Sequence, residues 1–123
     1  MTESKKKIEK FEDLIVWQKG IELCQEIYRI TNEGKLQKDW GFRDQIQRAS
    51  VSIPSNIAEG FGKYSNKEFK KYLAIANGSS FEVRSQLHLA CNLGYIGEIE
   101  AEKIIDLCTN ISKLIGGLRR SIM

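Results

Sequence analysis

Hydrophobic residues recur every three or four positions in four long segments of the chain, and this spacing predicts helices. The first segment runs from about Asp13 to Thr31 and carries two apolar stripes that lie side by side. One stripe is Trp17, Ile21, Cys24, Tyr28 and Thr31, and the other is Val16, Gly20, Leu23, Ile27 and Ile30. A helix packed into one core needs only one such stripe. Two stripes therefore predict a helix buried on two sides, inside its own subunit and against another.

The second segment is expected to begin near Phe42, after a turn-rich break at residues 33–41, and to end near Phe61. Its apolar positions keep their phase across the only proline of the chain, Pro54. A proline inside a helix removes one hydrogen bond and clashes with the preceding turn, at a cost of about 3 kcal/mol. The pattern therefore predicts a helix kinked at Pro54 rather than a loop.

The third and fourth segments carry recognisable end signals. Ser65, with Glu68 three residues later, has the spacing of a capping box at a helix start. Gly94 is placed to end that helix in a left-handed conformation, and the fourth helix follows from about Glu98 to Arg120. Four helices with short connections predict an all-α fold, an antiparallel up-down-up-down four-helix bundle. We assign residues 11–123 to this bundle domain and residues 1–10 to a flexible N-terminal tail.

The predicted kink leaves one backbone acceptor in need of a donor, because Pro54 cannot provide the helical N–H partner of the Ser50 carbonyl. In an antiparallel pair joined near Ser65, facing residue numbers sum to about 130, so Ser50 faces Ser80. We therefore expect the segment Asn77–Ser80 to pack against the kink and to help satisfy it, with Gly60 and Gly78 permitting close approach. Ser55, Asn56 and Glu59 are expected to form hydrogen bonds between helices or subunits. The predicted packing joint consists of Ser50, Pro54, Asn56, Glu59, Gly60, Asn77, Gly78 and Ser80.

Composition places the chain among ordinary soluble proteins of one domain. It has 123 residues, with 19 basic and 16 acidic side chains and a formal charge of +3, which permits an anionic partner without requiring one. No apolar run reaches the roughly 18 residues that span a bilayer, so we expect no membrane partner and a cytoplasmic location. The cysteines, Cys24, Cys91 and Cys108, are odd in number and far apart, which predicts buried thiols rather than a disulfide framework.

The sequence offers little catalytic chemistry. The only histidine is His88, and Ser85 precedes it by three residues, so the Glu-x-x-His pairs of di-metal bundles are absent. The scattered cysteines do not supply a zinc site. Cys91 lies one helical turn from His88, which makes this pair the best enzymatic candidate, but cysteine on an apolar helix is far more often part of a core. We predict a protein that is not an enzyme and that has no cofactor or metal.

Basic residues form the most suggestive polar pattern. Four lysines fall on one face around the start of the third helix, and two arginines end the fourth. Antiparallel packing brings these two places together into one basic end, which suits phosphate contact. The six residues are Lys63, Lys67, Lys70, Lys71, Arg119 and Arg120. The alternative is a set of solvated lysines together with arginines that compensate a helix C-terminus.

One long stretch, QIQRASVSIPSNIAEGFGKYSNKEFKKYLAIANGSSFEVRSQL (residues 45–87), resembles a known family. These are small bacterial four-helix-bundle proteins that are encoded in 23S rRNA intervening sequences and called ribosomal-protein-like. The most specific part is Arg48–Gly60, supported by Gly78-Ser79 and by Leu93–Ile96, and the resemblance extends from Phe11 into the last helix.

The resemblance implies a homo-oligomer, a pentamer of bundles arranged as a barrel. It also implies a relationship to the accessory proteins of diversity-generating retroelements, which associate with a reverse transcriptase and with nucleic acid. No catalytic residue carries over from the family. Gln47 and Asn77 stand where the family often has a basic residue, so this chain is less positive than many relatives.

Two hypotheses follow. In the first, the chain is a non-enzymatic homo-oligomer that associates with RNA or DNA through its basic surface. In the second, it is a structural or protein-binding scaffold without nucleic-acid binding.

Overall fold

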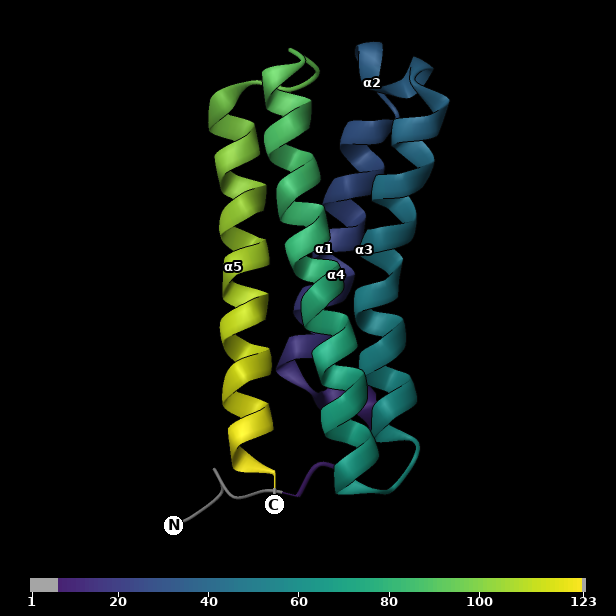
Figure 1. Cartoon of the computed structure of the whole chain (residues 1–123), viewed down its shortest axis with the longest axis vertical. Helices are drawn as coiled ribbons and strands as arrows, with labels where there is room; N and C mark the ends of the chain where they lie inside the picture. The colour runs from purple at the N-terminus through teal and green to yellow at the C-terminus, as the bar shows by residue number, and fades with distance from the viewer. Residues whose placement is uncertain (1–6, 123) are drawn as a thin grey trace.

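The computed structural model describes residues 7–122, and all the regular structure in this range is helical (Figure 1). A short 3-10 helix comes first, and five α-helices follow. The elements are η2 (Phe11–Asp13), α1 (Ile15–Thr31), α2 (Gly34–Lys38), α3 (Trp40–Phe61), α4 (Asn66–Asn92) and α5 (Glu98–Ser121). The predicted all-α class is therefore confirmed for the described chain. Most of the predicted tail, residues 1–6, lies outside the described residues, and residues 7–10 precede the first helix.

The four long helices lie side by side along the long axis of the molecule (Figure 1). Helix α3 packs against α1 and α4, and α5 packs against α4 and α1. The turn between α3 and α4 lies at the same end as the last turn of α5, and we call this the turn end. The short helix α2 lies at the opposite end, which we call the α2 end (Figure 1). None of the helices in residues 7–122 is long and apolar enough to cross a membrane.

One apolar core runs between the helices, and it settles which stripe of α1 faces inward. Leu23, Ile27 and Ile30 of α1 are fully or almost fully buried. The other stripe is only partly exposed, because Thr31 is buried and Cys24 is half-buried. Trp17 packs edge-on against Phe11 at 5.2 Å between ring centroids. Most of the stripe that begins at Trp17 is thus covered by its own chain. Its member Tyr28 remains 42% exposed.

Hydrogen-bonded caps fix the helix ends. The Asp39 carboxylate accepts from the N–H of Phe42 at 3.2 Å and starts α3. Ser65 accepts from the N–H of Glu68 at 3.3 Å and starts α4, as predicted. Gly94 has φ 75°, also as predicted, and the next N–H, that of Tyr95, donates to Ala90 at 2.9 Å. This is the Schellman arrangement that ends a helix.

The expectation of a plain break at residues 33–41 was wrong. The segment contains the helical turn α2, and Trp40 already belongs to α3. Leu36 is fully buried in this turn. The side chain of Leu36 closes the α2 end of the core, and its burial explains why α2 forms. The sequence did not predict α2, because so short a run of turn-forming residues shows no hydrophobic periodicity.

Helix α3 continues through Pro54 from Trp40 to Phe61. The partner of the Ser50 carbonyl is not the one predicted. The Cys24 thiol of α1 donates to this oxygen at 3.2 Å, whereas the Ser80 hydroxyl donates to Cys108 of α5 at 3.0 Å. The expectation that Asn77–Ser80 would satisfy the kink was therefore wrong, because Ser80 faces α5 and the donor comes from α1.

The α3–α4 contact still passes close to Pro54. The hydroxyl groups of Ser52 and Ser79 lie 2.8 Å apart and join the two helices. The amide of Asn56 donates to the Ser52 carbonyl at 2.8 Å and to its hydroxyl at 2.9 Å, which orients Ser52. The Oδ1 atom of Asn77 is buried and has no hydrogen-bond partner within the described residues. Glu59 is exposed on the last turn of α3.

Two glycines mark the closest approaches between helices. A Cβ added at Gly60 would lie 2.6 Å from the Cβ of Tyr72, so α3 and α4 could not approach this closely with any other residue there. A Cβ at Gly20 would lie 3.4 Å from two ring carbons of Pro54, a contact that sequence reasoning missed. Gly78 faces open space, so the close approach predicted for it was wrong.

Candidate nucleic-acid interface

The six predicted cations lie on three segments of the turn end. Lys63 is in the turn between α3 and α4, the other lysines are in the first two turns of α4, and both arginines are in the last turn of α5. Lys70 is half-buried and the other five are exposed. Ile122, just beyond the arginines, lines the same hollow as Asn66 at the start of α4. The end of α5 and the start of α4 are therefore neighbours.

The cations are not equally close to one another. The Nζ atoms of Lys63 and Lys71 each lie 5.8 Å from the ring centroid of Tyr72, so these two lysines flank one aromatic ring. Arg120 instead lies back along α5, where a Cβ added at Gly116 would be 3.4 Å from its Nη1 atom. The structure therefore brings Lys63 and Lys71 together at Tyr72 and leaves Arg120 against its own helix.

Within residues 7–122, carboxylates do not neutralise this cluster through ion pairs. The salt bridges found within residues 7–122 are Lys19–Glu22, Arg29–Glu26 and Arg29–Glu100. Arginines at the C-terminus of α5 stabilise the helix through its dipole, but a lysine in the first turn of α4, such as Lys67, opposes the dipole there. Glu68 in the same turn offsets part of that cost. Helix stability therefore does not explain the lysines at the start of α4.

Two tyrosines belong to this surface and were missed in the sequence. Tyr64 is 89% exposed, and its backbone has φ 54°, which residues other than glycine rarely adopt. Tyr72 is half-buried between the two lysines that flank it. The signal was present in KYSNKEFKKY (residues 63–72), where aromatic residues alternate with lysines, a combination that binds bases and phosphates together.

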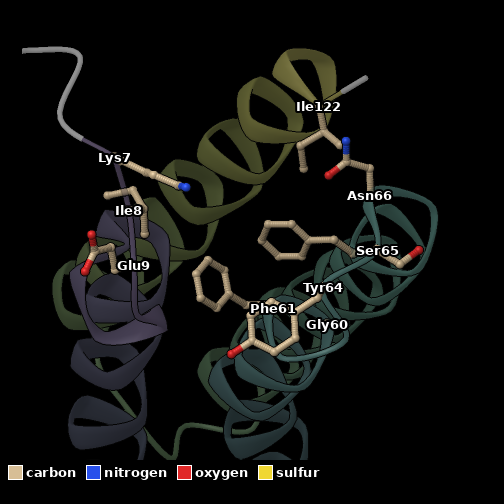
Figure 2. Close-up of a pocket in the computed structure, with 10 residues that line it drawn as sticks. Lys7, Ile8, Glu9, Gly60, Phe61, Tyr64, Ser65, Asn66 and Ile122 are labelled. Carbon is tan, nitrogen blue, oxygen red and sulfur yellow. The ribbon is translucent and has the colours of Figure 1, made fainter.

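A hollow of about 720 Å³ opens beside these residues. Phe61 and Phe69 meet edge to face inside it, with ring centroids 5.8 Å apart. Figure 2 shows Lys7 and Ile8 on one side of the hollow and Ile122 and Asn66 on the other. The hollow therefore has an aromatic floor and a rim that includes a cation.

The best enzymatic candidate lies on another face. His88 and Cys91 line a hollow of about 350 Å³ together with Glu98 and Glu102 of α5. Within residues 7–122 no hydrogen bond joins the imidazole to the thiol, and no three potential ligands are grouped to hold a metal.

The other two thiols are held in their protonated form. Burial raises the pKa of Cys24, although the side-chain hydroxyl of Ser50 acts in the opposite direction. Burial raises the pKa of Cys108 to about 12. Thiolates are the nucleophiles, so neither group is activated for catalysis.

Comparison with known proteins places the chain in a family. The family described as the 23S rRNA-intervening sequence protein matches residues 12–117. The chain belongs to this family. A crystal structure of a protein of unknown function from the S23 ribosomal protein family of Bacteroides thetaiotaomicron VPI-5482 is similar, with 29% identity and a TM-score of 0.78. That match covers 85% of this chain and 98% of the other.

The family is the one predicted from the resemblance at Arg48–Gly60. The matched residues include the lysines and tyrosines of the turn end and stop before Arg119. No protein with a curated description is significantly similar to the chain.

Proposed function

We propose that this protein is a non-enzymatic, homo-oligomeric, cytoplasmic protein that binds RNA or DNA through the turn end. The observation that carries the proposal is the cluster around Tyr72. Lys63 and Lys71 flank its ring at 5.8 Å, and Lys67 is exposed in the same first turns of α4. Cations and aromatic rings side by side match the two parts of a nucleotide, its phosphate and its base.

The energetics agree with a surface kept for a ligand. Lysines at a helix N-terminus oppose the helix dipole, and a tyrosine with positive φ costs about 1 kcal/mol or more. Burial of apolar surface does not offset either energetic cost, because Lys67 and Tyr64 are both exposed. A phosphate backbone would neutralise the lysines and release counterions, which is a favourable term that grows as salt falls.

Fluorescence anisotropy with a labelled RNA of about 12 nucleotides tests the proposal. The variant Lys63→Gln/Lys67→Gln is expected to bind several-fold more weakly than the unmodified protein at low salt. The matched control is Lys35→Gln/Lys38→Gln, which removes the same charge from α2 at the opposite end (Figure 1). Equal losses in the two variants would show that binding follows net charge rather than the turn end.

We also infer the architecture that places this surface. The four long helices form an antiparallel up-down-up-down bundle, in which α3 bends at Pro54. Support comes from the packing of each long helix against its neighbour in the chain, and from the Ser52–Ser79 bond, whose residue numbers match an antiparallel pair. The missing helical hydrogen bond at Ser50 removes one restraint against bending. Residual dipolar couplings along α3 measure this bend in solution.

The homo-oligomer is supported by apolar residues that stay exposed on α4. Ile75 and Leu89 of α4 and its C-cap residue Leu93 are between 44% and 49% exposed, and their spacing places them within about 40° of one face. Such a stripe on a long helix is suited to burial against a second copy. The pentamer and the reverse-transcriptase partner that the family resemblance implied stay predictions.

The scaffold without nucleic-acid binding remains the alternative function, and one observation favours it. The net charge is only +3. Gln47, where the family resemblance led us to expect a basic residue, donates to the Thr31 hydroxyl at 2.9 Å and ties α3 to α1. A side chain at position 47 that holds two helices together is consistent with a scaffold protein. This alternative predicts negligible RNA binding in the anisotropy experiment, for the unmodified protein and for both lysine variants.

A further inference from the structure

The hollow at the turn end differs from an ordinary surface groove in what lines it. Its floor is the edge-to-face pair of Phe61 and Phe69, and Tyr64 stands at its edge (Figure 2). Its volume of about 720 Å³ falls within the range of about 300–1,000 Å³ that is usual for ligand pockets. Aromatic rings on the floor and at the edge offer flat apolar surfaces to a planar ligand.

Tyr64 carries the strongest sign of a ligand. Its side chain is 89% exposed, so it contributes almost nothing to the core. Its left-handed backbone costs folding energy. An exposed aromatic ring held at a strained turn beside a hollow is explained by contact with something outside the chain.

The charges decide which part of a nucleotide belongs in the hollow. Glu9 lines it and would repel a phosphate placed inside. Lys7 is on the rim, and the turn that carries Tyr64 is flanked by Lys63 and Lys67. The hollow therefore suits an uncharged base, whose polar edge can pair with the Glu9 carboxylate or the Asn66 amide, while the lysines suit the adjoining phosphates.

We propose that the hollow holds an unstacked base of a single-stranded nucleic acid, with Phe61 and Tyr64 as its aromatic contacts and with Lys63 and Lys67 on the neighbouring phosphates. This inference rests on the proposed function and sharpens it. Bases inside a duplex are stacked and paired, so their faces are not available to a pocket. The ligand is therefore a single strand, a loop or an end.

The test compares single-stranded and duplex RNA of the same length, each of about 12 nucleotides, by fluorescence anisotropy. Tyr64→Ala is expected to weaken single-strand binding by about 5- to 150-fold, the usual effect of removing one aromatic base contact. The same variant is expected to change duplex binding less than about twofold, because the phosphate contacts remain. Tyr64→Phe keeps the ring and is expected to bind like the unmodified protein.

The control is Trp40→Ala, which removes another exposed aromatic side chain, 71% exposed, from the α2 end. This variant is expected to bind both RNAs normally. If Tyr64→Ala binds single strands as well as Trp40→Ala does, while Lys63→Gln/Lys67→Gln binds them weakly, the base site is wrong and the basic surface stands. If the unmodified protein binds neither RNA at low salt, the proposed function itself fails.

Discussion

The thiol of Cys24 on α1 donates to the carbonyl oxygen of Ser50 on α3, with 3.2 Å between Sγ and O. Pro54 has no N–H to offer this oxygen, which would otherwise accept a helical hydrogen bond from residue 54. A neighbouring helix thus supplies the donor that the proline removes. The same helix accommodates the proline ring at Gly20, where an added Cβ would lie 3.4 Å from it. The proline is tolerated because α1 satisfies the carbonyl and makes room for the ring.

Cys24→Ala should lower the free energy of unfolding by about 1–3 kcal/mol, because a largely buried acceptor loses its partner. The informative measurement is a double-mutant cycle with Pro54→Ala, followed by chemical denaturation at one protein concentration. In the Pro54→Ala background the N–H of residue 54 can donate to Ser50, so Cys24→Ala should cost less there. Equal costs in both backgrounds would show that the thiol acts only through packing.

Gly60→Ala should destabilise the protein by about 1–3 kcal/mol, because the new methyl group overlaps Tyr72 on α4. Gly78→Ala is the matched control, since it lies inside α4 and faces open space. Alanine is favoured over glycine in a helix, so this variant should gain about 0.5–1 kcal/mol. Urea denaturation of both variants checks the pair. A similar change in the two would mean that the α3–α4 contact at Gly60 is not tight.

Stability should fall at alkaline pH through the buried thiol of Cys108. Burial raises its pKa from 9.0 to about 12, so above pH 9 the unfolded chain loses this proton while the folded chain keeps it. The unfolded state then binds fewer protons, and the free energy of unfolding decreases as pH rises from about 9 towards 12, by roughly 1 kcal/mol per pH unit. Below pH 9 both states are protonated and this thiol contributes no pH dependence.

The control for this prediction is Cys108→Ala, which removes the titrating group. It should be less stable at every pH because it leaves a cavity, but its stability should fall less steeply above pH 9. Denaturation midpoints measured from about pH 7 to pH 10.5 give the two curves. Parallel curves for the two proteins would contradict the assignment of this pH dependence to Cys108.

The proposed self-association should depend on the exposed stripe of α4. Leu89→Glu/Leu93→Glu places charges where a second copy would bury apolar surface, and is expected to give a smaller particle by light scattering. Both positions are nearly half exposed, so the fold should tolerate the change, which circular dichroism checks. Ile99→Glu is the control, at a residue that is 76% exposed on α5. A monomer before any substitution would end the proposal of self-association.

Much of the fold was predictable because helices have sequence signals that involve only neighbouring residues. The periodicity of apolar residues located the long helices, and Ser65 and Gly94 located two of their ends through caps that need only neighbouring residues. The partner of the Ser50 carbonyl was not predictable in this way. Counting along α3 and α4 predicted only that Ser50 faces Ser80. The two helices do meet nearby through Ser52 and Ser79, but the donor to Ser50 comes from α1, whose rotation and height relative to α3 no local pattern specifies.

The candidate site shows the same division. The lysines of the turn end could be named from their spacing on α4, but Tyr64 could not be singled out, because its exposure and its positive φ belong to the folded turn. The hollow was also invisible in the sequence. It is formed by residues from three separate parts of the chain, such as Lys7, Phe61 and Ile122, and only the packed helices bring them together.

The central claim, that the turn end binds nucleic acid through phosphates and bases, is tested most directly by the salt dependence of RNA binding. The measurement is the slope of log K against log salt concentration for a single-stranded RNA, between about 25 and 200 mM salt. Four lysine–phosphate contacts predict a slope of about −3, since each contact contributes roughly −0.7 on a single strand. A protein that shows no binding at the lowest salt, or a slope near zero, would contradict the account.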